Sequence, residues 1–110
     1  MTPRKGIGEL ETSLLWIVMR LREAHGAQIR EELKERSGRS IGPGTLYPTL
    51  ERLEAKGFLS SRLGDPTPER GGRAKRLFAL TPAGLAEVRE AWRVVNRMAE
   101  GLEDLLADPG

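Results

Sequence analysis

Hydrophobic residues recur at the three- and four-residue spacing of amphipathic helices through most of the chain. A first helix is predicted over residues 9–22, with an apolar face made by Leu10, Leu14, Ile17 and Leu21. Neighbouring apolar residues, including Trp16, widen this face, which predicts burial on more than one side. The pattern breaks at His25 and Gly26, and a more polar helix is predicted over residues 27–37, with Gly38 as its stop.

A third helix is predicted from about residue 43 to residue 56. Its apolar positions repeat at spacings of four and three, at Leu46, Leu50 and Leu53. Gly57 follows directly and is a typical residue after a helix end.

The start of this third helix, IGPGTLYPTL at residues 41–50, contains two prolines. Pro43 suits the first helical position, with Gly42 before it as N-cap. Pro48 has no backbone N–H, so it either bends the first turns and leaves the Gly44 carbonyl without its helical donor, or the regular helix begins nearer Thr45. The sequence leaves both alternatives open.

Two short apolar runs beyond the third helix predict a β-hairpin. Residues 58–63 and 74–80 read as strands, and the second has Leu77 and Phe78 as its bulky members. The segment between them, GDPTPERGGR at residues 64–73, is rich in glycine and proline and is predicted as a long loop.

The last helix is predicted to begin after Thr81, a good N-cap, with Pro82 at its first position. Its apolar residues follow a heptad pattern, which is typical of helices that associate. The pattern consists of Leu85, Val88, Trp92, Val95, Ala99, Leu102 and Leu106. The whole order is three helices, a hairpin and a long helix. It predicts a mainly α-helical winged helix-turn-helix domain over residues 1–80 and a C-terminal dimerisation helix over residues 81–110, forming one structural unit.

Composition places the chain among globular proteins, with 110 residues, 31% charged and 38% hydrophobic. Net charge is +2, but residues 81–110 hold three basic and six acidic residues, whereas residues 1–80 hold 15 basic and 10 acidic ones. A basic front and an acidic back suit a nucleic-acid module with a separate non-contacting element, although two ordinary solvated surfaces would look the same. No apolar run approaches the ~20 residues that span a membrane, and the N-terminus lacks a signal-peptide core. We therefore expect a cytoplasmic protein without a membrane partner.

Nothing in the sequence favours catalysis. There is no cysteine, and the single histidine, His25, is most simply a turn residue. No cluster has metal-ligand spacing, and no phosphate-binding glycine loop is present. We expect neither an enzyme nor a bound cofactor or metal.

The third helix carries the candidate DNA contacts, because the second helix of a helix-turn-helix lies in the major groove and presents its N-terminal residues. Glycine there allows close approach of the backbone, and hydroxyls and cations can bond phosphates or base edges. The candidates on this helix are Gly44, Thr45, Tyr47, Thr49, Arg52 and Lys56, and those in the hairpin loop are Arg70, Arg73 and Lys75. The alternative interpretations are a polar face of a structural helix, half-buried packing for Tyr47, and a solubilising loop.

Both tryptophans, Trp16 and Trp92, fall on apolar helical stripes. Packing in the core or in a dimer interface is favoured over a ligand pocket.

The run GPGTLYPTLERLEAKGFL at residues 42–59 resembles the signature of PadR-family transcriptional regulators, whose recognition helix opens Pro-Gly-Thr/Ala-Leu-Tyr-Pro. The run GGRAKRLFALTPAG at residues 71–84 resembles the family's wing, second strand and Leu-Thr-x-x-Gly helix start. The resemblance covers roughly residues 8–106, and it is to the short subfamily with a single C-terminal helix.

This resemblance implies a winged-helix repressor that binds double-stranded DNA as a homodimer, with the C-terminal helix and often the first helix in the interface. A two-fold dimer predicts an operator with inverted half-sites. The implied interface residues are Leu10, Leu14, Trp16, Ile17, Leu85, Val88, Trp92, Val95, Ala99, Leu102 and Leu106. The resemblance also implies that a small-molecule effector can act, of a kind the sequence does not identify. The rival hypothesis is a winged-helix module that binds another protein.

The chain departs from the family pattern at two places. The aromatic residue usual before the second helix is missing from the run His25, Gly26, Ala27. The paired tyrosines usual before Leu-Thr are also absent, which removes any hydroxyl contact from that strand.

Overall fold

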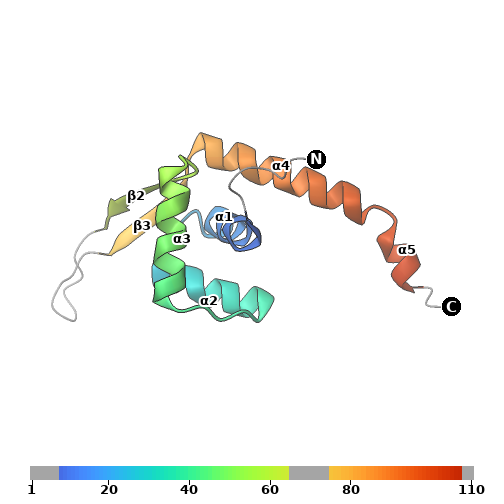
Figure 1. Ribbon diagram of the computed structural model, residues 1–110, viewed down its shortest axis with the longest axis horizontal. Coiled ribbons are helices and arrows are strands. Elements are labelled where there is room, and N and C mark those ends of the chain that lie inside the picture. Colours follow the sequence, from blue (N-terminus) through green and yellow to red (C-terminus); the bar gives the residue numbers. More distant parts are fainter. Residues whose placement is uncertain (1–7, 65–74, 108–110) are drawn as a thin grey trace.

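The computed structural model describes residues 8–64 and 75–107. Five helices and three strands follow one another in this part of the chain (Figure 1). In chain order they are α1 (Glu9–Leu21), β1 (Glu23–His25), α2 (Gly26–Ser37), α3 (Pro43–Ala55), β2 (Leu59–Leu63), β3 (Arg76–Leu80), α4 (Pro82–Ala99) and α5 (Leu102–Ala107).

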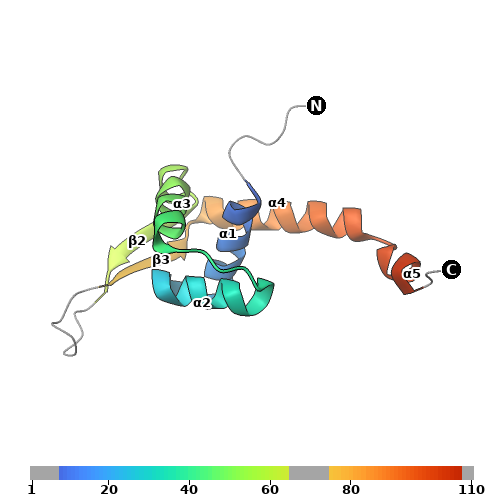
Figure 2. The same ribbon diagram turned by 60° about the horizontal axis from the view of Figure 1, so that its bottom comes forward.

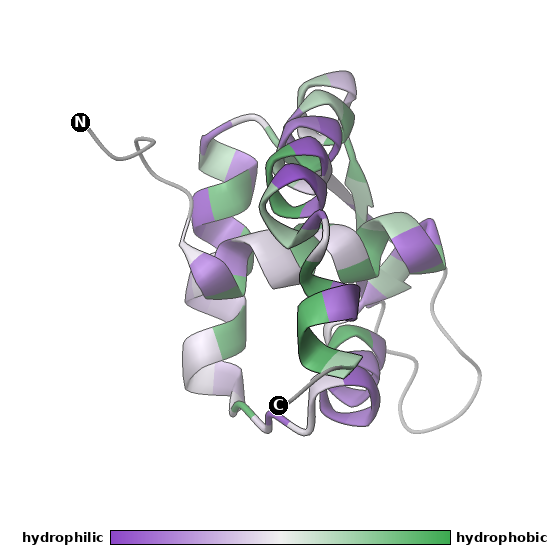
Figure 3. Ribbon diagram, turned by 90° about the vertical axis from the view of Figure 1, so that its right-hand side faces the viewer, coloured by the Kyte–Doolittle hydropathy of each residue, from purple (hydrophilic) through white to green (hydrophobic). Residues whose placement is uncertain are grey.

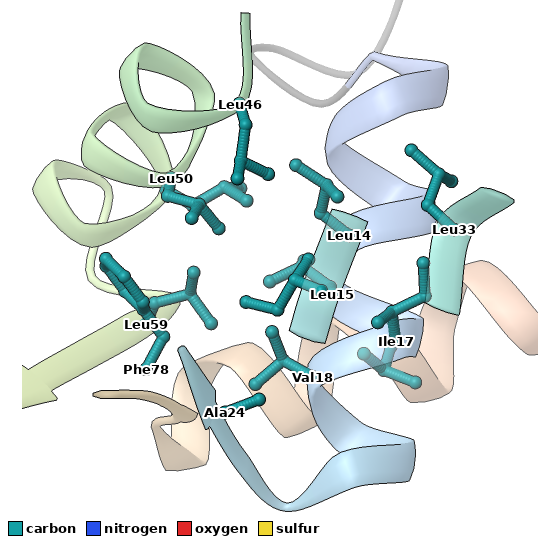
Figure 4. Close-up of a cluster of buried hydrophobic side chains, with 13 residues drawn as sticks. Leu14, Leu15, Ile17, Val18, Ala24, Leu33, Leu46, Leu50, Leu59 and Phe78 are labelled. Carbon is teal, nitrogen blue, oxygen red and sulfur yellow. The ribbon is translucent and has the colours of Figure 1, made fainter. Parts of the chain in front are cut away.

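Helix α1 lies at the centre of the domain, where it contacts α2, α3, α4 and β3. This position explains its broad apolar face, because a helix covered on several sides needs apolar residues around more than one stripe. Figure 4 shows its side chains meeting those of α3 and the sheet. The buried core consists of Leu14, Leu15, Ile17, Val18, Ala24, Ile29, Leu33, Leu46, Leu50, Leu53, Leu59, Phe78 and Val88.

The sheet has three antiparallel strands in the order β1-β3-β2, one more than the predicted hairpin. The extra strand β1 was missed because its three residues were read only as a break between helices. Ala24 is fully buried and pairs with Phe78, while His25 pairs with Leu77. This pairing fixes the start of α2 against the sheet.

The arrangement of α2, α3 and the sheet is a winged helix-turn-helix, so the predicted fold class is confirmed (Figures 1 and 2). Gly38 ends α2 in the left-handed conformation, with φ of 74°, and its N–H donates to the Lys34 carbonyl. Pro43 begins α3 with Gly42 as N-cap, which settles the choice between the two helix starts in favour of the earlier one.

Helix α4 begins as predicted, with Thr81 as N-cap and Pro82 at the first position. The Thr81 hydroxyl oxygen accepts from the Gly84 N–H at 3.0 Å and donates to the Gly57 carbonyl at 2.5 Å. The start of α4 is therefore joined directly to the chain segment that leads from α3 into β2.

The prediction of one continuous C-terminal helix is wrong. Helix α4 ends at Ala99, Gly101 adopts a left-handed conformation with φ of 82°, and α5 follows as a separate short helix. A left-handed residue cannot continue a right-handed helix, so the heptad stripe is interrupted before Leu102 and Leu106.

The C-terminal helices extend away from the winged-helix body (Figures 1 and 2). The radius of gyration is 16.5 Å, larger than the roughly 13 Å of a compact chain of this length. In the described part of the chain, none of the helices combines the length and apolarity required for crossing a bilayer.

Candidate nucleic-acid interface

The N-terminal end of α3 is open to solvent, and its first backbone N–H groups have no side-chain cap. Gly42, Pro43, Gly44 and Thr45 are all exposed, and the positions of Cβ atoms added at Gly42 or Gly44 would meet nothing within 4 Å. Pro43 has no N–H and the Thr45 N–H donates to the Gly42 carbonyl at 3.1 Å, which leaves the Gly44 N–H and the positive end of the helix dipole to attract an anion such as a phosphate. This end of α3 can therefore accept a nucleic-acid backbone at close range.

Besides Gly44, the predicted contacts Thr45 and Tyr47 are exposed near this end, and Arg52 is exposed in the last turn of α3. Tyr47 is 42% exposed, so part of its side chain packs against the protein and part can contact a ligand. This exposure is compatible with both the predicted DNA contact and the alternative of half-buried packing. Together they offer two hydroxyls and one guanidinium to a ligand lying along the helix.

Thr49 is a correction, because its side chain is only 1% exposed and cannot reach a ligand. Its hydroxyl donates to the Thr45 carbonyl at 2.7 Å and accepts from the Arg52 guanidinium at 3.1 Å. The buried Thr49 hydroxyl therefore helps to position the Arg52 guanidinium. The sequence alone could not distinguish this supporting role from that of an exposed hydroxyl that contacts DNA.

Lys56, another predicted contact, is at the C-terminal end of α3 rather than at its open N-terminal end. It follows the last residue of α3, about 20 Å along the axis from Pro43 at 1.5 Å per residue, and its ammonium pairs with the Glu11 carboxylate at 2.6 Å. This ion pair connects the end of α3 to the start of α1, so we assign Lys56 a structural role in the fold.

Pro48 lies inside α3. Because proline has no N–H, the Gly44 carbonyl loses the helical donor that residue 48 would otherwise supply. The exposed carbonyl belongs to the same turn as the exposed glycines, so the irregular residues lie at the open end of the helix.

Replacing Pro48 by alanine is expected to raise the free energy of unfolding by about 1 kcal/mol or more, because it restores that hydrogen bond. Urea or thermal unfolding measures the gain. Pro43→Ala is the matched control, since a missing N–H at the first helical position costs little, and it should give no gain. Equal stability of wild type and Pro48→Ala would contradict the inference that the Gly44 carbonyl lacks a hydrogen-bond donor.

The wing contributes Lys75, which is exposed immediately before β3. Arg70 and Arg73, the other predicted loop contacts, lie outside the described residues. Arg76 begins β3 and donates to the Ser61 hydroxyl at 2.8 Å, which in turn donates to Glu54 at 2.7 Å.

A hollow of about 290 Å³ joins the start of α2 to the wing; it is lined by His25, Gly26, Ala27, Tyr47, Lys75 and Arg76. Burial, together with the charge of the nearby Lys75, lowers the pKa of His25 from its usual value. The lowered pKa favours the neutral histidine, and the cations Lys75 and Arg76 supply positive charge to the hollow. Sequence reasoning did not bring these residues together, because the missed strand β1 is what places His25 beside the wing.

The predicted interface residues divide into three groups by burial. Leu14, Ile17 and Val88 are buried in the chain's own core, so their assignment to an interface with another chain is wrong. Leu10, Trp16 and Leu85 are partly buried. The exposed members are Trp92, Val95, Ala99, Leu102 and Leu106.

Other apolar residues extend this exposed set, and Figure 3 shows hydrophobic positions along the C-terminal helices. Trp92 is 59% exposed, and both Met98 and Leu106 are 77% exposed. The additional exposed apolar residues are Met19 on α1, Val94 and Met98 on α4, and Leu105 on α5; Val94 lies about 140° around α4 from the heptad stripe at 100° per residue and is therefore separate from it. Large exposed apolar residues on helices that extend from the body of the fold indicate an interaction site.

The two tryptophans meet edge to face at the root of this surface, with ring centroids 6.3 Å apart and planes at 68°. Beside them is a hollow of about 550 Å³ lined by Trp16, Met19, Arg20, Arg22, Val88, Arg89 and Trp92. Among the described residues, the buried indole N–H of Trp16 has no hydrogen-bond acceptor. Because residues of both α1 and α4 line this hollow, the surface continues from α4 onto α1.

Comparison with known proteins connects this geometry to one group of proteins. The model of the Transcriptional regulator PadR-like family matches residues 14–90. Transcriptional regulator Rv3488 of Mycobacterium tuberculosis (strain ATCC 25618 / H37Rv) is 47% identical over 79 residues, covering 70% of this chain and 67% of that protein.

Solved structures share the fold. Bacillus subtilis PadR in complex with operator DNA matches with a TM-score of 0.66 and 26% identity, covering 79% of this chain and 48% of that one. F93 from STIV, described as a winged-helix DNA-binding protein, matches with a TM-score of 0.69 and 19% identity, covering 88% and 98% of the respective chains. The chain spans about half the length of the PadR protein seen on DNA.

Proposed function

The chain belongs to the PadR-like family of transcriptional regulators, and from that premise we propose that it is a homodimeric repressor that binds an inverted-repeat operator. The family is a non-enzymatic class, as the sequence predicted. The finer statements, namely the repressor role, the dimer and the operator symmetry, are our proposal. The observation that carries it is the open N-terminal end of α3, with Gly42 and Gly44 unobstructed in front of it.

DNA binding by this end of α3 is supported by its chemistry. The Gly44 N–H at the helix N-terminus, two exposed hydroxyls and the Arg52 guanidinium can bond both phosphates and base edges. The similar PadR of Bacillus subtilis was solved with operator DNA. The proposed contacts are Gly44, Thr45, Tyr47 and Arg52 on α3, with Lys75, Arg70 and Arg73 from the wing.

Dimerisation is supported by the apolar surface of α4 and α5. An isolated chain would leave Trp92, Met98 and Leu106 in water, whereas a second copy would cover them. We assign the hollow beside Trp16 to the partner's helix. Residues 81–110 then form most of the dimerisation part, with α1 adding to it, and residues 1–80 carry the DNA-binding part. Two-fold symmetry then places the two α3 helices on half-sites about one DNA turn or a small multiple apart. The expectation of a small-molecule effector stays a prediction.

The test uses DNA flanking the coding region in a mobility-shift assay over a range of salt concentrations. We expect tight binding to a segment with inverted half-sites, falling steeply with salt as phosphate-bound counterions are released. Absence of steeply salt-dependent DNA binding would instead support the alternative, a winged-helix module that binds another protein. Reduced transcription from the bound promoter in the presence of the protein tests the repressor role.

Lys75→Ala is expected to weaken binding to all DNA sequences by a similar factor and to reduce the salt slope by about one, because it removes one phosphate contact. Lys34→Ala is a suitable control, since Lys34 lies in the last turn of α2, at the far end from the hollow. Both slopes come from the same salt titration. An unchanged slope for Lys75→Ala would remove this residue from the interface.

A further inference from the structure

We propose that Gly26 is the positioning residue for Tyr47: the absence of a side chain at the start of α2 is what lets the tyrosine ring lie across it. The consequence for DNA affinity rests on the proposed function. The seating of the ring is a property of the fold itself.

The geometry leaves no room for a side chain at residue 26. A Cβ atom there would lie 2.7 Å from Cζ and 2.8 Å from Cε1 of Tyr47, and closer still to the hydroxyl oxygen. Carbon atoms in van der Waals contact are separated by about 3.5 Å or more. Either the ring or the start of α2 would have to move.

The backbone gives no other reason for glycine at this position. Among the described glycines, left-handed conformations occur at Gly38, Gly57 and Gly101, and Gly26 is not one of them. Glycine at the first position of a helix also loses more conformational entropy than alanine. The tyrosine ring is therefore the feature that excludes a side chain at residue 26.

The backbones on both sides of this contact cannot withdraw easily, so a side chain at residue 26 would displace the end of the half-exposed Tyr47 ring. The start of α2 is fixed because His25 pairs with Leu77 in the sheet and donates its N–H to the Gln28 side chain at 3.0 Å. Tyr47 follows Leu46, which is fully buried in the core. The distance between Gly26 and the tyrosine backbone is thus set by packed elements on both sides.

The seated ring faces the wing. Tyr47 lines the hollow together with His25 and Lys75, so its hydroxyl and the lysine ammonium can engage one DNA strand at the same time. A phenol hydroxyl donates well to a phosphate oxygen. Gly26 thereby determines the position at which α3 and the wing together contact the DNA backbone.

The test is a double-mutant cycle on operator affinity with Gly26→Ala, Tyr47→Ala and the variant with both changes. We expect Gly26→Ala to weaken binding roughly tenfold in the wild-type background, as expected for one lost hydrogen bond to a charged group. In the Tyr47→Ala background the same change should alter affinity less than about twofold, because the obstructing ring is gone. Equal losses in both backgrounds, or no loss in the wild type, would overturn the proposal.

Gly8→Ala is the matched control for adding a methyl group, since its nearest neighbour is the Glu11 side chain at 3.8 Å and its backbone is extended. It should leave operator affinity unchanged. If Gly26→Ala does not fold, the double variant should, because removing the ring makes space for the methyl group. Unfolding of both would show that glycine is needed for another reason.

A second measurement separates this proposal from the proposed function. Tyr47 is the single tyrosine of the chain, so a sample labelled on tyrosine rings gives one set of ring NMR signals. Gly26→Ala should shift these signals and Gly8→Ala should not. If the wild type bound no operator, the proposed function would fail, while an unmoved ring signal would refute the seating of Tyr47.

Discussion

Gly84→Ala is expected to lower the free energy of unfolding by about 3 kcal/mol or more, and the melting temperature by more than about 10 °C. A Cβ atom at this position would overlap the Phe58 carbonyl oxygen and lie 3.0 Å from its carbonyl carbon. It would also lie 3.1 Å from the Leu80 side chain. Because the obstruction is backbone, no rotamer change can relieve it.

The Phe58 carbonyl cannot move without breaking the junction between α4 and the sheet. It accepts the Thr81 N–H at 3.1 Å, and the Thr81 hydroxyl bridges the Gly57 carbonyl and the Gly84 N–H. An added methyl group at Gly84 can therefore be accommodated only if α4 moves away from the sheet or if these three hydrogen bonds are broken.

Urea and thermal unfolding measure the effect, and Gly44→Ala provides the control. The Cβ added at Gly44 meets open space in a helix, so alanine there should be neutral or stabilise by up to about 1 kcal/mol. A Gly84→Ala protein within about 1 kcal/mol of wild type would mean that α4 sits more loosely on the sheet than the structure places it.

The same junction illustrates how far the sequence could be interpreted. Thr81 as N-cap and Pro82 at the first helical position were predicted because capping depends on residues within one turn. The close contact of Gly84 with Phe58 was not, because it joins residues on two elements that meet only in the folded chain. Strand β1 was missed for a similar reason: Ala24 and Phe78 are 54 positions apart in the sequence.

In the candidate site, too, local features could be predicted from the sequence and contacts between distant elements could not. The shape of the α3 start could be predicted from Pro43 and Gly42, whose effects are local. Whether Thr49 faces solvent or the core depends on how α3 is rotated against α1, and periodicity fixes that angle too coarsely to place a residue on the boundary. The heptad stripe likewise could not show that Val88 faces the chain's own core while Trp92 faces outward.

Trp92→Glu is expected to convert the protein from dimer to monomer and to weaken operator binding by more than about 100-fold. Trp92 is 59% exposed in the single chain, while its edge packs on Trp16. In a two-fold dimer the change would bury two carboxylates in an apolar seam, and burying an unpaired charge costs several kcal/mol. Each 1.4 kcal/mol is a factor of ten in the dissociation constant.

The substitution should spare the fold, because the core below Trp92 is made by Leu14, Ile17 and Val88, which stay buried within one chain. Light scattering measures the mass, and circular dichroism checks the helices. Ala86→Glu is the matched control: it adds the same charge to α4 at an exposed position, about 140° around the helix from the apolar stripe at 100° per residue. It should remain dimeric and bind the operator as wild type does. A Trp92→Glu protein that stays dimeric would place the seam elsewhere, and one that becomes monomeric yet binds at full affinity would show that dimerisation is unnecessary for recognition.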